Sequence, residues 1–81
     1  MKYLKSIYQL KKLEEFAMKN SIGCYGVGFN IDYSDSKGWT GTIYLPIPQG
    51  DNIKDDGFSV DGVTFYEAVD KLWSMVKKKL N

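Results

Sequence analysis

Residues 25–33 read Tyr-Gly-Val-Gly-Phe-Asn-Ile-Asp-Tyr, with a large apolar side chain at every second position. A period of two predicts a β-strand with one apolar face, because successive side chains of a strand point to opposite faces. A turn-rich segment follows, and a second run at 39–45 puts Trp39, Ile43 and Leu45 on one face. The two runs predict an antiparallel hairpin.

The opposite face of this hairpin is predicted to be polar and open. It carries Gly26, Gly28, Asn30, Asp32, Thr40, Thr42 and Tyr44. The pair Gly26 and Gly28 lies inside a strand and lacks a third glycine, so it does not match a dinucleotide-binding turn. Tyr44 is the one large aromatic residue on this face, which makes it a candidate contact for a partner.

Before the hairpin, the apolar spacing becomes helical. Leu10, Leu13 and Ala17 follow Ser6-Ile-Tyr-Gln9, a sequence that resembles a capping box. We therefore expect a helix from Ser6 that ends near Asn20 and Gly23. Residues 1–5 either extend this helix or form a loose arm.

After the hairpin, Pro46 and Pro48 are expected to end regular pairing, because proline has no N–H for a sheet ladder. The polar stretch Gln49–Gly57 is then predicted to be an exposed loop. Phe58 and Val60 indicate a short third strand, followed by an Asp61-Gly62 turn.

A second helix is predicted from Thr64, because Thr64-Phe-Tyr-Glu67 matches a capping box. Its core-facing residues recur at helical spacing: Phe65, Val69, Leu72, Val76 and Leu80. Three consecutive lysines near the end of the chain lie where the helix dipole favours cations.

These elements predict one small α+β domain over residues 1–81, in the order α-β-β-β-α. A three-stranded antiparallel sheet with both helices packed on one face is the economical arrangement, since two amphipathic helices cover only one face.

This order is similar to that of the double-stranded RNA-binding domain, and the similarity would span most of the chain. That family implies lysines at the start of the second helix and a Gly-Pro-x-His loop. Here the helix starts with Thr64-Phe-Tyr-Glu67 and the loop is Ser34-Asp-Ser-Lys-Gly38. Because neither site matches, we do not transfer the family's function.

The composition points away from catalysis. The 81 residues contain no histidine and no arginine, and Cys24 is the single cysteine. Imidazole chemistry, guanidinium clamps and an internal disulfide are therefore excluded. We expect no enzyme activity and no cofactor. Asp51 begins an acidic stretch, but Ile53 breaks the spacing of a calcium loop, so no metal is expected.

The first residues lack the apolar segment of a secretory signal, and no window is apolar enough to span a membrane. With one unpaired cysteine, this pattern favours a reducing, cytoplasmic location without membrane contact.

We expect a protein-protein interaction module. The candidate protein-binding residues are Tyr44 and Thr42 on the open face and Asp51, Asp55 and Asp56 in the acidic loop. Small, lysine-rich, histidine-free chains of this kind are typical of accessory proteins of phages and mobile elements, including inhibitors of host defence enzymes. A homodimer is a further expectation, because so small a chain gains stability from association.

The alternative is nucleic-acid binding. Lys5, Lys12 and Lys19 recur every seven residues and would form a stripe on the first helix, and Lys77 and Lys78 add charge on the last. The acidic middle of the chain would repel phosphates, so this interpretation takes second place.

Overall fold

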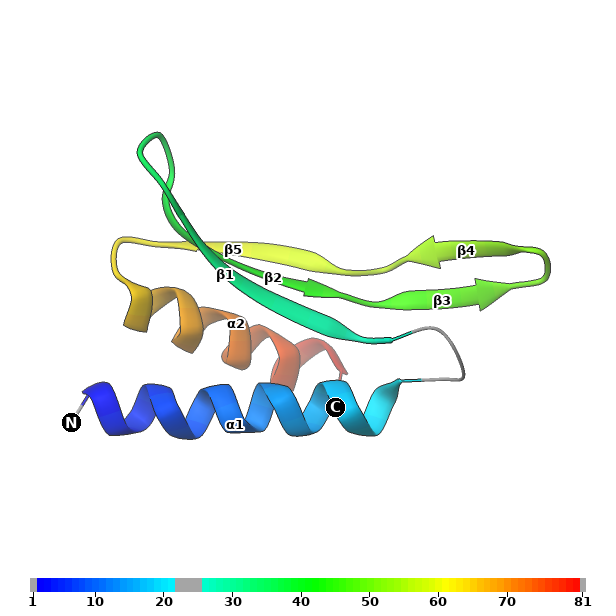
Figure 1. The fold of residues 1–81 in the computed structure, drawn as a ribbon, viewed down its shortest axis with the longest axis horizontal. Coiled ribbons are helices and arrows are strands. Elements are labelled where there is room, and N and C mark those ends of the chain that lie inside the picture. Colours follow the sequence, from blue (N-terminus) through cyan, green and yellow to red (C-terminus); the bar gives the residue numbers. More distant parts are fainter. Residues whose placement is uncertain (1, 22–25, 81) are drawn as a thin grey trace.

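A computed structural model describes residues 2–21 and 26–80 of the chain. Its elements, in order, are α1 (Lys2–Asn20), β1 (Gly28–Ser34), β2 (Gly38–Tyr44), β3 (Pro46–Gln49), β4 (Asn52–Asp55), β5 (Phe58–Gly62) and α2 (Phe65–Leu80) (Figure 1). The α+β class is therefore confirmed. Cys24 and Tyr25, predicted at the start of the first strand, lie outside the described residues.

The main sheet is three-stranded and antiparallel, as the sequence predicted, and its strand order is β1-β2-β5. The Cα pairs place Phe29, Ile43 and Phe58 in one apolar row across the three strands. The next row along is polar and points to the opposite face. The predicted division into an apolar and a polar face is thus confirmed for residues 28–44.

Strands β2 to β5 form one long hairpin. The β2–β5 and β3–β4 ladders share one register, because the residue numbers of every Cα pair add to the same total. Asp56 N donates to Leu45 O at 2.9 Å and carries this register between the two ladders. The predicted loop at Gln49–Gly57 is therefore wrong. We call β3, β4 and their turn the arm, and Figure 1 shows it extending past both helices.

Two local features explain why the arm forms. Gly50 has a φ of 63° and opens the two-residue turn Gly50-Asp51, and a type II′ hairpin turn requires glycine at that position. Pro46 and Pro48 are tolerated because alternate residues of a strand point their N–H groups away from the partner strand. The backbone N–H and C=O of Leu45 both point toward the β4 side. Because this direction alternates along a strand, the backbone nitrogens of Pro46 and Pro48 point away from β4, where no N–H is needed for the ladder.

Helix α1 starts at Lys2, so the structure shows the extended helix and not the loose arm among the two alternatives for the residues before Ser6. The capping box assigned to Ser6 and Gln9 is wrong, since both residues lie within the helix and are buried. Gln9 Nε2 instead donates to Asp70 Oδ1 of α2 at 2.7 Å. Residues 2–5 extend the helix, and Asn20 ends it as expected.

Helix α2 has its predicted cap. Thr64 Oγ1 accepts from Glu67 N at 3.1 Å, and Glu67 Oε1 reaches back to accept from Val63 N at 3.3 Å. This arrangement satisfies two N–H groups at the start of the helix. Asp61 and Gly62 do not form the predicted turn, because both pair with β2 as the end of β5.

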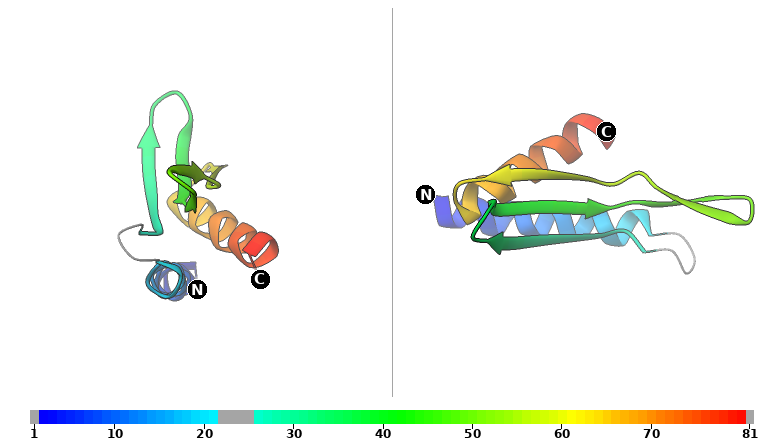
Figure 2. Two further views of the ribbon diagram at one scale, coloured as in Figure 1. Left: turned by 90° about the vertical axis from the view of Figure 1, so that its right-hand side faces the viewer. Right: turned by 90° about the horizontal axis from the view of Figure 1, so that it is seen from above.

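The core lies between the helices and the main sheet. Leu13, Ile43, Leu72 and Val76 form its buried cluster, and Val69 is also fully buried. Helix α2 contacts β2 and β5, whereas α1 contacts α2 and β1. Figures 1 and 2 show the two helices starting at the same end of the molecule, with the C-terminal part of α2 diverging from α1.

Candidate protein-binding surface

The polar face of the main sheet is built from short side chains that bond across strands. Thr42 Oγ1 lies 3.0 Å from Ser59 Oγ, and Thr40 Oγ1 donates to Asp61 Oδ1 at 3.2 Å. Cross-strand pairs of this kind fix side-chain positions on an antiparallel sheet. Thr42, a predicted binding residue, is therefore held in place within a polar surface.

Tyr44, the second predicted residue on this face, ends β2 where the arm begins. The residue is 46% exposed. The Cα partner of Tyr44 is Gly28, and a Cβ added at Gly28 would stand 4.0 Å from Tyr44 Cδ2. The tyrosine ring thus lies beside β1, at an ordinary contact distance from the Gly28 position.

An apolar stripe continues from Tyr44 onto the arm. Because the register is unbroken, Tyr44, Pro46 and Pro48 share one side of the strand, and Ile53 joins them as the Cα partner of Pro48. Leu45 has the opposite parity and packs against the core, which confirms that the stripe points outward. We call Tyr44, Pro46, Pro48 and Ile53 the arm stripe.

The other side of the arm carries Ile47, which pairs with Lys54. Ile47 is 41% exposed and Ile53 is 52% exposed, although they lie on opposite sides of the ribbon. All four residues of β4 are exposed, as are the last three of β3. The arm therefore adds almost nothing to the core and presents its side chains to solvent.

The predicted residue Asp55 fixes the corner between the arm and the sheet. Its Oδ1 accepts from Leu45 N at 3.2 Å and from Gly57 N at 2.9 Å. At Gly57 an added Cβ would collide with the backbone oxygen of Ile43, so the chain passes the corner without space for a side chain. The Asp55 carboxylate is thus engaged in positioning the arm.

Asp51 and Asp56 stand at the two ends of the arm. Asp51 lies in the exposed turn at the tip. Asp56 lies at the base, with Oδ1 4.0 Å from Lys54 Nζ, and both side chains are more than half exposed. Exposed ion pairs of this kind contribute little to stability. Because Asp56 pairs with Leu45, it lies on the side of the ribbon opposite the arm stripe, whereas Asp51 leaves negative charge at the tip, beyond the end of the stripe.

The lysines of the nucleic-acid alternative are partly engaged. Lys5 Nζ lies 3.4 Å from Asp70 Oδ1, and Lys12 Nζ lies 3.4 Å from Glu15 Oε2. Lys77 Nζ stands 5.8 Å from the ring centre of Trp73. For Lys19 and Lys78, the described part of the chain shows no ion pair. Binding of nucleic acid by this set stays a prediction.

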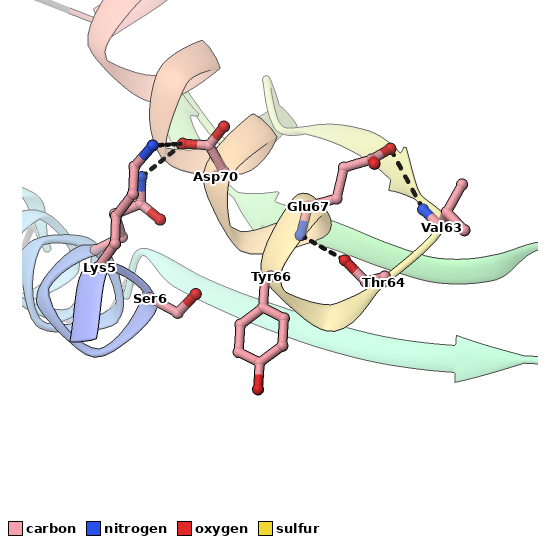
Figure 3. Close-up of a pocket in the computed structure, with 8 residues that line it drawn as sticks. Lys5, Ser6, Val63, Thr64, Tyr66, Glu67 and Asp70 are labelled. Carbon is pink, nitrogen blue, oxygen red and sulfur yellow. Dashed lines mark hydrogen bonds and ion pairs between the residues drawn. The ribbon is translucent and has the colours of Figure 1, made fainter. Parts of the chain in front are cut away.

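A pocket of about 530 Å³ that the sequence did not indicate lies between the N-terminal halves of the two helices. Figure 3 shows Lys5 and Asp70 pointing toward each other across it. Its lining residues are Lys5, Ser6, Gln9, Val63, Thr64, Tyr66, Glu67 and Asp70. In the sequence, the pocket is marked only by two polar residues, Ser6 and Gln9, which the structure shows to be buried. Because these residues also fit a helix cap, the sequence did not point to a pocket.

The two carboxylates that line this pocket, those of Glu67 and Asp70, already have hydrogen-bond donors and lysine charges of the protein beside them. A hydrogen bond from Lys71 holds the pKa of Glu67 below its ordinary value, and Val63 N–H acts in the same direction. The hydrogen bond from Gln9 likewise lowers the pKa of Asp70, assisted by the charge of Lys5. Neither carboxyl is therefore poised as a proton donor near neutral pH.

No family model matches the chain, and the curated proteins and the solved structures contain no match either. In residues 2–21 and 26–80 no three His, Cys, Asp or Glu side chains are grouped so that they could hold a metal ion. No helix in the described part of the chain is long and apolar enough to cross a membrane.

Proposed function

We propose that the protein is a non-enzymatic module that binds another protein through the arm stripe and the adjoining polar face of the main sheet. The proposal takes both helices to cover one face of that sheet, so that the face carrying Thr42 and Tyr44 stays open.

The observation that supports this proposal is the arm itself. A two-stranded ribbon is marginally stable on its own, and ordering its residues costs conformational entropy. The arm recovers little of that cost, because nearly all of its side chains are exposed. An extension that contributes so little to the fold is well suited to a contact with a partner, and it offers Tyr44, two prolines and Ile53 as anchors.

The surface also indicates the chemistry of the partner. The arm stripe supplies an apolar centre, and Asp51 supplies negative charge at the tip of the arm. A complementary surface would be apolar in the middle and basic at the edge. The composition is typical of phage and mobile-element accessory proteins, so we infer that the partner is a host enzyme, of the defence class, which the module inhibits by covering its surface.

The test removes the arm without disturbing the sheet. In an arm-shortened variant, Asn-Gly replaces residues 46–55 and joins Leu45 to Asp56. These two residues are already paired through their backbones, and Asn-Gly is a preferred two-residue hairpin turn, so the register is retained. Both tagged proteins are used to capture partners from a lysate of the native cells, with and without nuclease, and are analysed by mass spectrometry.

We expect the full-length protein to recover one protein in near-stoichiometric, nuclease-resistant amounts, and the shortened variant to lose it. Ile53→Lys and Ile47→Lys provide a matched pair on opposite sides of the arm. Ile53→Lys should weaken binding at least about tenfold, a loss of roughly 1.4 kcal/mol, whereas Ile47→Lys should not. Recovery of the same partner by the shortened variant would refute the proposal. Recovery that vanishes with nuclease would favour the lysine set.

A further inference from the structure

Helix α1 has a second apolar side that the core does not use. Tyr3, Leu4, Ile7, Tyr8 and Met18 are between 41% and 73% exposed. At about 100° per residue, Leu4, Ile7, Tyr8 and Met18 lie roughly 120–180° from the buried Leu13, and Tyr3 lies at the edge of this group, about 80° from Leu13. The exposure of these residues shows that neither α2 nor the main sheet covers them. We call these five residues the outer face of α1.

The centre of this face follows a coiled-coil repeat. Leu4, Ile7, Lys11, Glu14 and Met18 are spaced by alternating steps of three and four residues, the spacing of a and d positions. The pattern puts apolar residues at both ends of the seam and two opposite charges in its middle. Among the described residues, neither Lys11 nor Glu14 forms an ion pair.

The charges make this seam complementary to itself in one orientation. When two copies of α1 pack antiparallel about a two-fold axis, Lys11 of each copy faces Glu14 of the other, and Ile7 faces Met18. A parallel pair would instead place Lys11 against Lys11 and Glu14 against Glu14. A polar residue at an a position is a known determinant of register and orientation in coiled coils.

The available area is adequate for a modest dimer. Together the five side chains expose about as much surface as three fully exposed large residues, on the order of 600 Å² per copy at roughly 200 Å² each. A standard interface buries about 800 Å² per partner, and Lys11, Glu14 and Glu15 would supply the remainder.

We propose that the outer face of α1 is the contact surface of an antiparallel homodimer, with the Lys11–Glu14 pairs setting its register. This surface is separate from the arm stripe, so the two proposals can fail independently.

The test exchanges charges between two variants. Lys11→Glu leaves two glutamates in the middle of the seam, and Glu14→Lys leaves two lysines. Each variant alone brings like charges together in the dimer, whereas a mixture of the two restores both opposite-charge pairs. Molecular mass is measured by sedimentation equilibrium, over a hundredfold range of concentration that reaches millimolar. Circular dichroism checks that the helix content of each variant is unchanged.

We expect the wild-type protein to approach the dimer mass as concentration rises. Each single variant should dimerise at least about tenfold more weakly, and the equimolar mixture should regain the wild-type affinity. Lys19→Glu is the matched control, since Lys19 lies on the flank of the helix and its change should leave dimerisation unaltered. A monomeric wild type, or single variants that associate as well as the wild type, would overturn the proposal.

Discussion

Replacing Gly62 by alanine should destabilise the protein through a backbone collision. Gly62 ends β5 beneath the first turn of α2, where an added Cβ would stand 2.6 Å from Ala68 N and 3.1 Å from Ala68 Cα. Ordinary contacts begin at 3.4 Å, so the first turn of α2 must retreat by about 0.8 Å. Rotation of a side chain cannot relieve this collision, because the atoms belong to the helix backbone.

The expected cost follows from two opposing effects. Overpacking of this kind costs about 1–3 kcal/mol. Alanine also restricts the unfolded chain, which returns about 0.4–1 kcal/mol because Gly62 does not have a positive φ. The net loss of about 1–2 kcal/mol is large for 81 residues, whose total stability is on the order of 4–12 kcal/mol. It corresponds to a decrease in Tm of about 5–15 °C.

Urea unfolding followed by tryptophan fluorescence is a suitable assay, because Trp39 is the Cα partner of Gly62. Gly26→Ala is the matched control: among the described residues, the nearest atom to its added Cβ is Ser21 Oγ at 3.9 Å, which is an ordinary contact distance. We expect the midpoint of Gly62→Ala to fall and that of Gly26→Ala to stay level or rise slightly. Equal midpoints for the two variants would refute the packing of α2 on Gly62.

Two further predictions concern helix α2. Thr64→Ala removes the side-chain acceptor for Glu67 N and should cost about 1 kcal/mol, measured by thermal unfolding, whereas Thr64→Ser should cost little. Asp70 has a folded-state pKa below its ordinary value, so its contribution to stability is present above the unfolded-state pKa and lost as pH falls through the folded-state pKa. Urea midpoints from pH 7 downward should therefore fall more for the wild type than for Asp70→Asn, and parallel curves would contradict this assignment.

The strands could be predicted wherever the apolar alternation was uninterrupted. β1 and β2 carry one row of apolar residues on one face, and a one-residue slip would expose that row, so the pattern determines both strand and register. The second helix was equally clear, because Thr64 and Glu67 sit directly before an apolar stripe. In both cases local propensity and the final packing agree.

The start of α1 could not be predicted, because Ser6 and Gln9 fit two environments. In sequence they match a cap, yet in the structure they lie between two helices, where Gln9 bonds to Asp70 far along the chain. The competing signal was the apolar cluster Tyr3, Leu4, Ile7 and Tyr8, which continues the helical period but does not face the core. A residue pattern shows that a face is apolar and does not show what covers it.

The arm was not predicted, because the two prolines of β3 and the turn between β3 and β4 give opposite indications. Gly50-Asp51 is a hairpin signal, but proline in a strand normally indicates the end of pairing. That rule concerns only the side of the strand to which the missing N–H would point. Here Leu45 directs its backbone groups toward β4, so Pro46 and Pro48 lack their N–H groups on the β1 side.

The same two prolines explain why the sheet narrows from three strands to two. In the register of β1 with β2, Gly28 faces Tyr44, and continuation of β1 would place Gly26 opposite Pro46. Pro46 has no N–H to offer there, and β1 accordingly pairs only from Gly28 onward. The prolines also leave the outer edge of β3 without donors, which disfavours edge-to-edge association through that strand. The arm is thereby kept as a free two-stranded ribbon whose accessible features are its side chains, and this is the condition that recognition through the arm stripe requires.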